Sequence, residues 1–403
     1  MRFAITGVTV SGNMGGAAML AATVDELSRR APGAQFSLLS ISPQRDRMHG
    51  IADVEIVSAK PLQLLLLYLP LSVLVWPFAS VSFVRRALAR IPYFRSLMEA
   101  DEVIDLCGIA FVDGRGLLLL VYNVACCLPA IIFGTPVAKL AQALGPFRTQ
   151  PNRILAKFVL ERCALLVARG ETSLSFIKEI GLAHAISLPD TSFAMEVDKL
   201  HRDAANQMVP RFLEGNKLLI ASPSEVVRRL CQRSGIKFED EFSAFLRARI
   251  AEGWNVLLVP HSLGVGNSKN NDIDLCRSIA SALQAGRVYM IEPIEDPRIL
   301  RALIGKADAF VGCRFHSVVA ALSMGVPSLV VGWSHKYQEM MAMLQGGEWF
   351  IDAASVSSKR LENLFARFEA ELPALRHEIA SKLPQVRSQA RENFELAARI
   401  PGA

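Results

Sequence analysis

Short apolar runs alternate with stretches of helix length along most of the chain. In the first half, the runs fall at residues 3–8, 36–42, 54–59, 102–108, 136–142, 165–170 and 185–190. In the second half, they fall at residues 217–224, 255–262, 288–292, 309–314 and 328–333. Strands that alternate with helices form parallel sheets with both faces covered. The pattern therefore predicts an α/β chain with two Rossmann-like, doubly wound domains.

The length of 403 residues also favours two domains, because single hydrophobic cores rarely grow beyond roughly 250–300 residues. We expect an N-terminal domain over residues 1–195 and a C-terminal domain over residues 196–350, with a polar stretch at their boundary. Beyond Trp349, apolar residues recur at helical spacing. Residues 351–403 are therefore expected to form helices that pack back on the body.

One segment departs from the pattern of a water-soluble domain. Residues 61–84, between Lys60 and Arg85, carry no charge and are numerous enough to span a bilayer. Pro70 and Pro77 interrupt helical hydrogen bonding, and one span would place two parts of a single domain on opposite sides of the membrane. We therefore predict a hairpin of helices over residues 62–84, either buried in the core or in contact with a membrane surface.

Charge and cysteine content narrow the class of protein. Lys and Arg exceed Asp and Glu by 44 to 38, but no basic run occurs. A nucleic-acid partner is therefore not expected. The seven cysteines form no C-x-x-C pair, and the first apolar run leads directly into a glycine turn. These features indicate a reduced, cytoplasmic protein that is not exported, with peripheral contact on the inner face of the cytoplasmic membrane as an option. The oligomeric state, a homo-oligomer included, stays open.

The junction at residues 311–323 carries the strongest chemical signal. The run AFVGCR ends at Arg314, and Phe315 and His316 begin a predicted helix that stops at Gly325. Helix N-termini offer free N–H groups and a partial positive charge, so the junction predicts an anion site. Arg314 adds a guanidinium suited to phosphate or carboxylate, and His316 could serve as a general acid. The ordinary alternative is an arginine and a histidine that only cap and pack a helix end.

Other polar residues follow the predicted strands, where parallel sheets bind ligands. They are Asn13 and Gly15 in a glycine-rich turn, Arg169, His261 and Lys336. Arg169 is equally well explained as a partner in a structural salt bridge, and the loops of His261 and Lys336 as ordinary surface loops. The glycine-rich turn matches neither G-x-G-x-x-G nor G-x-x-x-x-G-K-[ST]. The sequence also lacks H-E-x-x-H and Cys/His ligand spacing, so no metal site is expected.

Five segments together resemble the polysaccharide pyruvyl transferase family. They are YNVACCLPAIIFGTPVAKLAQALGPF, LERCALLVARGETSLSFIKEIGL, PDTSF, VPHS and GCRFHSVVAALSMGVPSLVVGWSHKY. The resemblance implies a GT-B-like fold whose two domains face a cleft, and transfer of pyruvate from phosphoenolpyruvate to a sugar as a ketal. It implies phosphoenolpyruvate binding in the second domain, an acceptor in the first, and no cofactor. The acceptor would be a sugar of an exopolysaccharide or its lipid-linked oligosaccharide precursor.

The resemblance also assigns roles to particular residues. Arg314 and His316 match the catalytic Arg-x-His pair, with Phe315 in place of the usual leucine. Arg169 matches the first domain's strand-end arginine, and Lys336 matches the family's lysine. We therefore take Arg314 and His316 as candidate catalytic residues, and a second group as candidate substrate-binding residues: Arg169, Phe315, His261, Lys336, Asn13 and Gly15.

Two departures from the family pattern concern the acceptor side. Gly16 follows Asn13-Met14-Gly15 where the family carries an acid, and the segment after Asp105 has lost most of its glycines. Two alternatives therefore stay open: a sugar-nucleotide glycosyltransferase on the same fold, or a non-catalytic member that binds a glycan or a partner protein.

Overall fold

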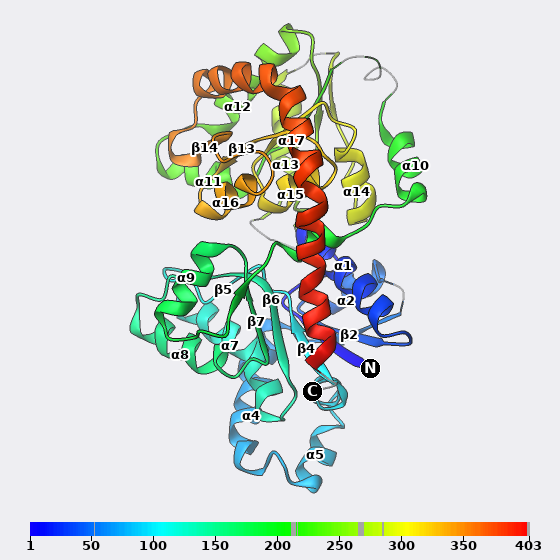
Figure 1. Ribbon diagram of the computed structural model, residues 1–403, viewed down its shortest axis with the longest axis vertical. Helices are drawn as coiled ribbons and strands as arrows, with labels where there is room; N and C mark the ends of the chain where they lie inside the picture. The colour runs from blue at the N-terminus through cyan, green and yellow to red at the C-terminus, as the bar shows by residue number, and fades with distance from the viewer. Residues whose placement is uncertain (52, 211–214, 216, 265–269, 284–285, 401–403) are drawn as a thin grey trace. The chain divides into compact units, whose positions relative to one another are not determined.

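Two separate parallel sheets organise the chain in the computed structural model (Figure 1). The structure describes residues 1–403 except 52, 211–214, 216, 265–269, 284–285 and 401–403. The chain separates into two units. Unit 1 comprises Met1–Ser11, Met19–Ala194 and Ser388–Ala403, and unit 2 comprises Gly12–Ala18 and Met195–Arg387. Residues 12–18 thus belong to unit 2, although they lie within the N-terminal domain expected from the sequence.

Unit 1 contains a sheet of eight strands in which every pair is parallel. The path runs β3-β2-β1-β4-β6-β7-β8, and β5 pairs with β6 beside it. The strands are β1 (Arg2–Thr6), β2 (Gln35–Ser40), β3 (Val54–Ser58), β4 (Glu102–Asp105), β5 (Ile109–Ala110), β6 (Val137–Leu144), β7 (Leu165–Ala168) and β8 (Ile186–Ser187). The strand order reverses between β1 and β4, as in a doubly wound fold.

Unit 2 contains six parallel strands in the order β11-β10-β9-β12-β13-β14. They are β9 (Leu218–Ser222), β10 (Asn255–Leu258), β11 (Val288–Met290), β12 (Ala309–Gly312), β13 (Ser328–Gly332) and β14 (Phe350–Asp352). Here the order reverses between β9 and β12. Each predicted apolar run contains a strand, which confirms the predicted pair of doubly wound sheets. The short strands β5 and β14 were not predicted.

Helices occupy the connections between the strands. In and around unit 1 they are α1 (Met14–Arg30), α2 (Pro43–Met48), α3 (Pro61–Gln63), α4 (Leu69–Val75), α5 (Ser82–Leu88), α6 (Pro92–Glu99), α7 (Leu117–Ile132), α8 (Gln150–Leu160) and α9 (Glu171–Glu179). In unit 2 they are α10 (Lys199–Met208), α11 (Glu225–Arg233), α12 (Phe238–Ala251), α13 (Ile273–Leu283), α14 (Pro297–Ile304), α15 (Phe315–Ser323) and α16 (His335–Ala342). Helix α17 (Ser358–Arg399) starts in unit 2 and ends in unit 1.

The long helix α17 contributes to the cores of both units. In unit 2, Phe365 meets the rings of Phe245 and Trp254 edge-on, at centroid distances of 5.5 Å each. In unit 1, the side-chain amide of Asn393 donates to the carbonyl of Pro189 at 3.3 Å. Burying a phenylalanine in such a cluster stabilises by roughly 1.5–3 kcal/mol. The apolar spacing seen after Trp349 in the sequence therefore marks core positions.

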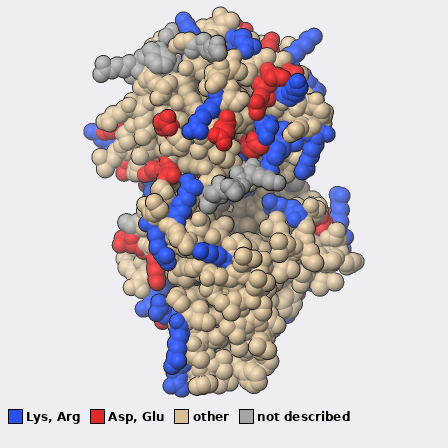
Figure 2. All heavy atoms as spheres, turned by 180° about the vertical axis from the view of Figure 1, so that it is seen from behind, with Lys and Arg blue, Asp and Glu red and all other residues tan. Residues whose placement is uncertain are grey.

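The uncharged segment after β3 forms two helical arms joined by a turn. The first arm runs from Pro61 to Phe78 through a π-helical turn, η1 (Leu64–Tyr68), and a 3₁₀ turn, η2 (Trp76–Phe78), and the second is α5. Pro70 does not end the first arm, because the π-helical turn directly before it relieves the constraint on the backbone. The end of unit 1 that carries α4 and α5 (lower end of Figure 1) presents a broad uncharged surface, with Lys and Arg along one edge (Figure 2).

Unit 1 also buries ionisable groups within its sheet. Lys139 on β6 forms an ion pair with Asp105 at the end of β4, and both side chains are almost fully buried. Glu102, the first residue of β4, is fully buried, and its carboxyl oxygens have no hydrogen-bond partner among the described residues. Burial raises the pKa of Glu102 to about 9. The Glu102 carboxyl is therefore neutral at pH 7.

The buried Glu102 carboxyl predicts how stability depends on pH. Its pKa is about 9 in the folded state and near the ordinary value of 4.5 in the unfolded state. The contribution of the neutral Glu102 carboxyl to the free energy of unfolding is fully present below pH 4.5. It is lost as pH rises to about 9, by up to about 1.4 kcal/mol per pH unit. Glu102→Gln removes this loss, so we expect the variant to be more stable than wild type at about pH 8, by on the order of 1–4 kcal/mol.

Urea unfolding of both proteins at about pH 4.5, 6 and 8 measures this difference. Glu99→Gln is the matched control, because Glu99 lies three residues away on the surface and its substitution should leave the pH dependence unchanged. Parallel pH profiles for wild type and Glu102→Gln would show that the buried carboxyl is ionised in the folded state.

Candidate functional site

The candidate site of unit 2 lies where the strand order reverses. Strands β9 and β12 are neighbours there, and the Cys313 amide after β12 donates to the carbonyl of Ser222 on β9 at 2.9 Å. Arg314 follows directly and is the N-cap residue of α15. Ligands of doubly wound sheets bind at this position, beyond the carboxyl ends of the strands. The structure thus places Arg314, Phe315 and His316 at the ligand-binding edge of their sheet.

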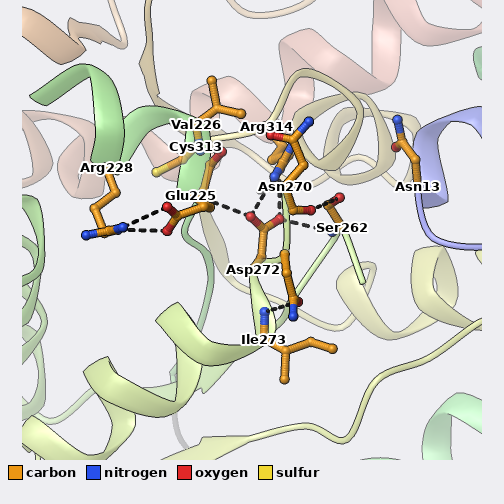
Figure 3. Close-up of polar contacts among 12 residues, drawn as sticks. Asn13, Glu225, Val226, Arg228, Ser262, Asn270, Asp272, Ile273, Cys313 and Arg314 are labelled. Atoms are coloured by element: carbon orange, nitrogen blue, oxygen red, sulfur yellow. Dashed lines mark hydrogen bonds and ion pairs between the residues drawn. The ribbon is translucent and has the colours of Figure 1, made fainter. Parts of the chain in front are cut away.

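Arg314 is held by a carboxylate that the sequence analysis did not identify. Its Nε donates to Oδ2 of Asp272 and its Nη2 donates to Oδ1, both at 2.7 Å (Figure 3). This is a two-pronged ion pair with a fully buried Asp272. The pair uses two of the five N–H groups of the guanidinium. Asp272 therefore fixes the plane of Arg314 and leaves the other N–H groups available to a ligand.

Asp272 also accepts hydrogen bonds from two backbone amides. The amide of Ser262, after β10, donates to Oδ2, and the amide of Glu225, at the start of α11, donates to Oδ1, each at 3.0 Å (Figure 3). One carboxylate thus joins the loops that follow three neighbouring strands, β10, β9 and β12. Because Asp272 immediately precedes α13, its position in the sequence is typical of a helix cap, which conceals this tertiary role.

The glycine-rich turn near the N-terminus is attached to the loop after β10. The Met14 amide donates to the carbonyl of His261 at 3.3 Å, and the Leu263 amide donates to the carbonyl of Gly12 at 2.7 Å. Asn13 forms an isolated bridge with Ser262. These bonds explain why residues 12–18 belong to unit 2. They also place the N-terminal end of α1 beside the Arg314 junction.

Gly15 touches His316 so closely that no other residue fits. A Cβ atom on Gly15 would overlap the imidazole ring of His316. The side-chain oxygen of Asn13 accepts the Gly15 amide at 3.0 Å, which caps the first turn of α1. The structure therefore brings together Asn13, Gly15 and His316, although about 300 residues separate the two segments in the chain.

His261 shows how positive this region is. The side chain is buried, and its pKa lies well below 6.5, because burial disfavours the charged form and because His316, Arg314 and Arg301 repel a further proton. His261 is therefore a neutral imidazole at pH 7. Two cations and the N-termini of α1 and α15 surround it, so the region favours an anionic ligand.

Lys336 lies among three aromatic rings, one of which is Phe315 of the Arg314 junction. Its ammonium stands over the rings of Trp333, Phe315 and Tyr337, at 5.1, 5.4 and 5.7 Å from the centroids. Phe315 in turn meets His316 edge-on at 5.2 Å. Attraction between a cation and aromatic faces holds such a lysine in place. Phe315 thus supports both Lys336 and His316.

Arg169 belongs to unit 1 and has structural partners there. Its side chain is buried after β7, donates from Nε to the carbonyl of Ala141 at 2.8 Å, and pairs with Asp190 at 3.0 Å. Asp190 belongs to the PDTSF segment, so the pair joins two of the segments that carry the family resemblance. Seven of the eight predicted site residues belong to unit 2, and Arg169 belongs to unit 1.

The assembled residues suit an anionic ligand. Arg314 offers N–H groups in a fixed plane, the N-terminal ends of α1 and α15 add a partial positive charge, and His316 offers an imidazole that can exchange a proton. Among the described residues, no group of three or more His, Cys, Asp or Glu side chains could hold a metal ion. The arrangement can bind a phosphate or carboxylate and transfer one proton beside it.

Comparison with known proteins identifies the family. The model of the family "Polysaccharide pyruvyl transferase" matches residues 13–335. The chain belongs to this family. It is also 24% identical over 266 residues to the amylovoran biosynthesis protein AmsJ of Erwinia amylovora. That match covers 64% of this chain and 63% of the length of AmsJ.

Solved structures resemble the fold at low sequence identity. The UDP-GlcNAc 2-epimerase of Neisseria meningitidis, bound to UDP-GlcNAc, matches with a TM-score of 0.60 and 13% identity over 98% of this chain and 99% of its own. A UDP-forming α,α-trehalose-phosphate synthase of Burkholderia vietnamiensis matches with a TM-score of 0.54 and 11% identity over 99% and 98% of the two chains. These similarities confirm the GT-B-like fold and do not bear on activity.

The role of Asp272 can be tested through stability. Asp272→Ala leaves the Arg314 guanidinium without its partner and two backbone amides without their acceptor. Loss of one member of a buried pair costs about 3–5 kcal/mol. We therefore expect the free energy of unfolding of unit 2 to fall by roughly that amount. Tryptophan fluorescence during urea unfolding reports on it, since Trp254, Trp333 and Trp349 all lie in unit 2.

Asp274→Ala is the matched control for this experiment. Asp274 lies two residues further along the chain, is exposed, and pairs only with the surface residue Arg277 among the described residues. Its loss should change stability by less than about 1 kcal/mol. Equal effects of the two substitutions would contradict the central role given to Asp272.

Proposed function

We propose that this protein transfers the pyruvyl group of phosphoenolpyruvate to two hydroxyls of a sugar, forms a ketal and releases phosphate. The observation that carries the proposal is the Arg314-Phe315-His316 segment, which lies at the anion-binding edge of unit 2 in a chain of the polysaccharide pyruvyl transferase family. The geometry described above supports the donor half of this reaction.

The donor carries a phosphate and a carboxylate, and the site offers groups for both. Arg314 suits one anionic end because Asp272 holds its guanidinium in one plane. The partial positive charge at the N-terminal ends of α1 and α15 suits the other. Holding both ends would fix the position of the reacting carbon, which supplies much of the effect of a transferase. The proposal needs no metal and no cofactor.

His316 is the proposed general acid. Its proton adds to the methylene carbon of phosphoenolpyruvate, which becomes a methyl group, and C2 becomes electrophilic. One sugar hydroxyl adds to C2, phosphate leaves, and a second hydroxyl closes the ketal. Of the two hydroxyl protons, one restores the imidazolium of His316 and the other leaves with the phosphate. Such proton transfer contributes about 10²–10⁴-fold to the rate.

The acceptor is proposed from the relatives rather than from the site. AmsJ is named for amylovoran biosynthesis, so we propose a sugar of a cell-surface polysaccharide or of its lipid-linked precursor. Assembly on a lipid would place the enzyme in the cytoplasm, at the inner face of the cytoplasmic membrane. Lys336, Phe315 and His261 are proposed to shape the donor side.

A sugar-nucleotide enzyme is the second candidate, because solved structures with this fold include one bound to UDP-GlcNAc. The positive edge of unit 2 would suit a nucleoside diphosphate as well as phosphoenolpyruvate. A pyruvyl transferase should bind phosphoenolpyruvate, and a sugar-nucleotide enzyme should bind a nucleoside diphosphate sugar. A titration measures this difference directly.

Calorimetric titration with phosphoenolpyruvate, and separately with UDP-GlcNAc, tests the proposal. We expect phosphoenolpyruvate to bind saturably and UDP-GlcNAc not to bind. Arg314→Ala should weaken phosphoenolpyruvate binding at least about tenfold, because a charge-assisted hydrogen bond contributes about 1.5–3 kcal/mol. Arg314→Lys should weaken it less, since the charge remains but the planar fork is lost.

Arg277→Ala serves as the control, because Arg277 is an exposed arginine of the same unit, and thermal unfolding confirms that each variant is folded. Binding of UDP-GlcNAc without phosphoenolpyruvate would favour the glycosyltransferase. Absence of binding to both ligands would favour a non-catalytic binding protein.

Substitution of His316 tests the chemical step. His316→Gln keeps a hydrogen-bonding side chain but cannot act as an acid. We expect phosphoenolpyruvate to bind within about threefold of wild type, while phosphate release with p-nitrophenyl glycosides of several hexoses falls by about 10²–10⁴-fold. Equal loss of binding and turnover would make His316 a binding residue only.

A further inference from the structure

Exposed apolar side chains gather on one short segment of unit 1. Of the nineteen large hydrophobic residues that are exposed in the described chain, nine lie within residues 62–83. They are Leu62, Leu66, Leu67, Val73, Leu74, Trp76, Phe78, Val81 and Phe83. Soluble proteins rarely leave so dense a group uncovered unless a partner or a membrane covers it. We call these nine residues the apolar face.

The fully buried residues of the first arm lie along one side of it. Its buried residues, Leu64, Tyr68 and Ser72, recur every four positions and so form a single stripe. Tyr68 stacks on Tyr93 at a centroid distance of 4.2 Å and meets Phe94 edge-on. Leu66 and Leu74, in contrast, are each 74% exposed. Leu66 and Leu74 therefore lie outside the core, whereas Trp76 of the apolar face meets Phe158 edge-on at 6.2 Å.

The arm Pro61–Phe78 has the length and composition of a membrane span, with a mean hydropathy of 1.7. Its surroundings argue against a crossing. Strand β3 precedes the two arms and β4 follows them, and both strands belong to one sheet. A single crossing would separate them, and α5, with seven residues, is too short to return. The segment is therefore suited to lie in the surface of a bilayer.

The charges around the apolar face identify the kind of surface. Residues 56–98 contain no Asp or Glu and five basic residues, Lys60, Arg85, Arg86, Arg90 and Arg95. Arg85 donates to the carbonyl of Phe133 at 3.1 Å and so ties α5 to the end of α7. Arg86 on α5 and Arg90, two residues after its end, are exposed. Figure 2 shows basic residues along the edge of the uncharged surface at this end of unit 1.

A second copy of the chain fits this surface poorly. A two-fold dimer buries the same patch of both copies, so it would bring Arg86 and Arg90 of each copy to one interface. Anionic lipid headgroups pair with such arginines, while the acyl region accepts leucine, phenylalanine and the tryptophan ring. Trp76 and Phe78 at the turn between the arms are residue types that bilayer interfaces favour.

We propose that the apolar face and its flanking arginines form a membrane-binding surface. The turn between the two arms inserts into the headgroup region of the leaflet that faces the protein, in an anionic bilayer, without spanning it. The inference rests on unit 1 alone and does not depend on the proposed reaction. It would, however, bring an enzyme of that kind to a lipid-linked acceptor.

Vesicle flotation with the full-length protein tests this proposal. We expect the protein to float with vesicles of phosphatidylcholine and phosphatidylglycerol, to float poorly with phosphatidylcholine alone, and to be partly released by high salt. Leu66→Glu combined with Leu74→Glu should weaken binding at least about tenfold. Arg86→Glu combined with Arg90→Glu should remove the preference for phosphatidylglycerol.

Leu200→Glu is the matched control, because Leu200 is 76% exposed on α10 of unit 2, outside the apolar face. It should bind vesicles like wild type. Brominated lipids should quench part of the tryptophan fluorescence, and Trp76→Phe should abolish that quenching. Phosphoenolpyruvate titration of the Leu66/Leu74 variant should match wild type, which separates failure of this inference from failure of the proposed reaction.

Three results would overturn the inference. The first is that wild type floats with neither kind of vesicle. The second is that the Leu66/Leu74 variant binds vesicles as well as wild type does. The third is that wild type binds no vesicles and sediments as a dimer, while the Leu66/Leu74 variant sediments as a monomer. The last result would make the apolar face a protein interface.

Discussion

The ion pair between Asp272 and Arg314 is the interaction on which the candidate site depends. A buried carboxylate is tolerated only when charge and hydrogen bonds compensate for the loss of water. Asp272 receives both from one guanidinium and two backbone amides. The same four bonds fix the relative positions of the loops after β9, β10 and β12. A single acid thus converts three strand ends into one rigid edge that can orient Arg314 towards a ligand.

The second constraint is the close contact between Gly15 and His316. Because a side chain on Gly15 would overlap the imidazole, the start of α1 can approach the site only with glycine at this position. Hydrogen bonds from the Met14 and Leu263 amides hold the two segments together. The N-terminal end of α1 therefore contributes the partial positive charge of its first turn to an edge formed otherwise by residues after 195. Burial, and then the charges of His316, Arg314 and Arg301, lower the pKa of His261 at this edge.

The strands and the Arg314 junction were predictable from the sequence, because both depend on local patterns. Apolar runs of the right length mark buried parallel strands, and a cation at a strand end before a helix marks an anion site. Asp272 was not predictable, since an aspartate before a helix normally caps it. The pairing of Arg169 with Asp190 was not predictable either, since no spacing in the chain reveals it. The assignment of residues 12–18 to unit 2 likewise depends on tertiary hydrogen bonds.

The apolar segment 61–84 shows a different limit of sequence reasoning. Leucine occupies every side of its first arm, so composition does not reveal which side faces the core. The choice is made by Tyr68, which stacks on Tyr93 and so turns Leu64 and Ser72 inward with it. Once one stripe is fixed, the helix geometry sends Leu66 and Leu74 outward. Exposed leucines such as Leu66 and Leu74 add nothing to the stability of the folded chain, so folding alone does not account for them.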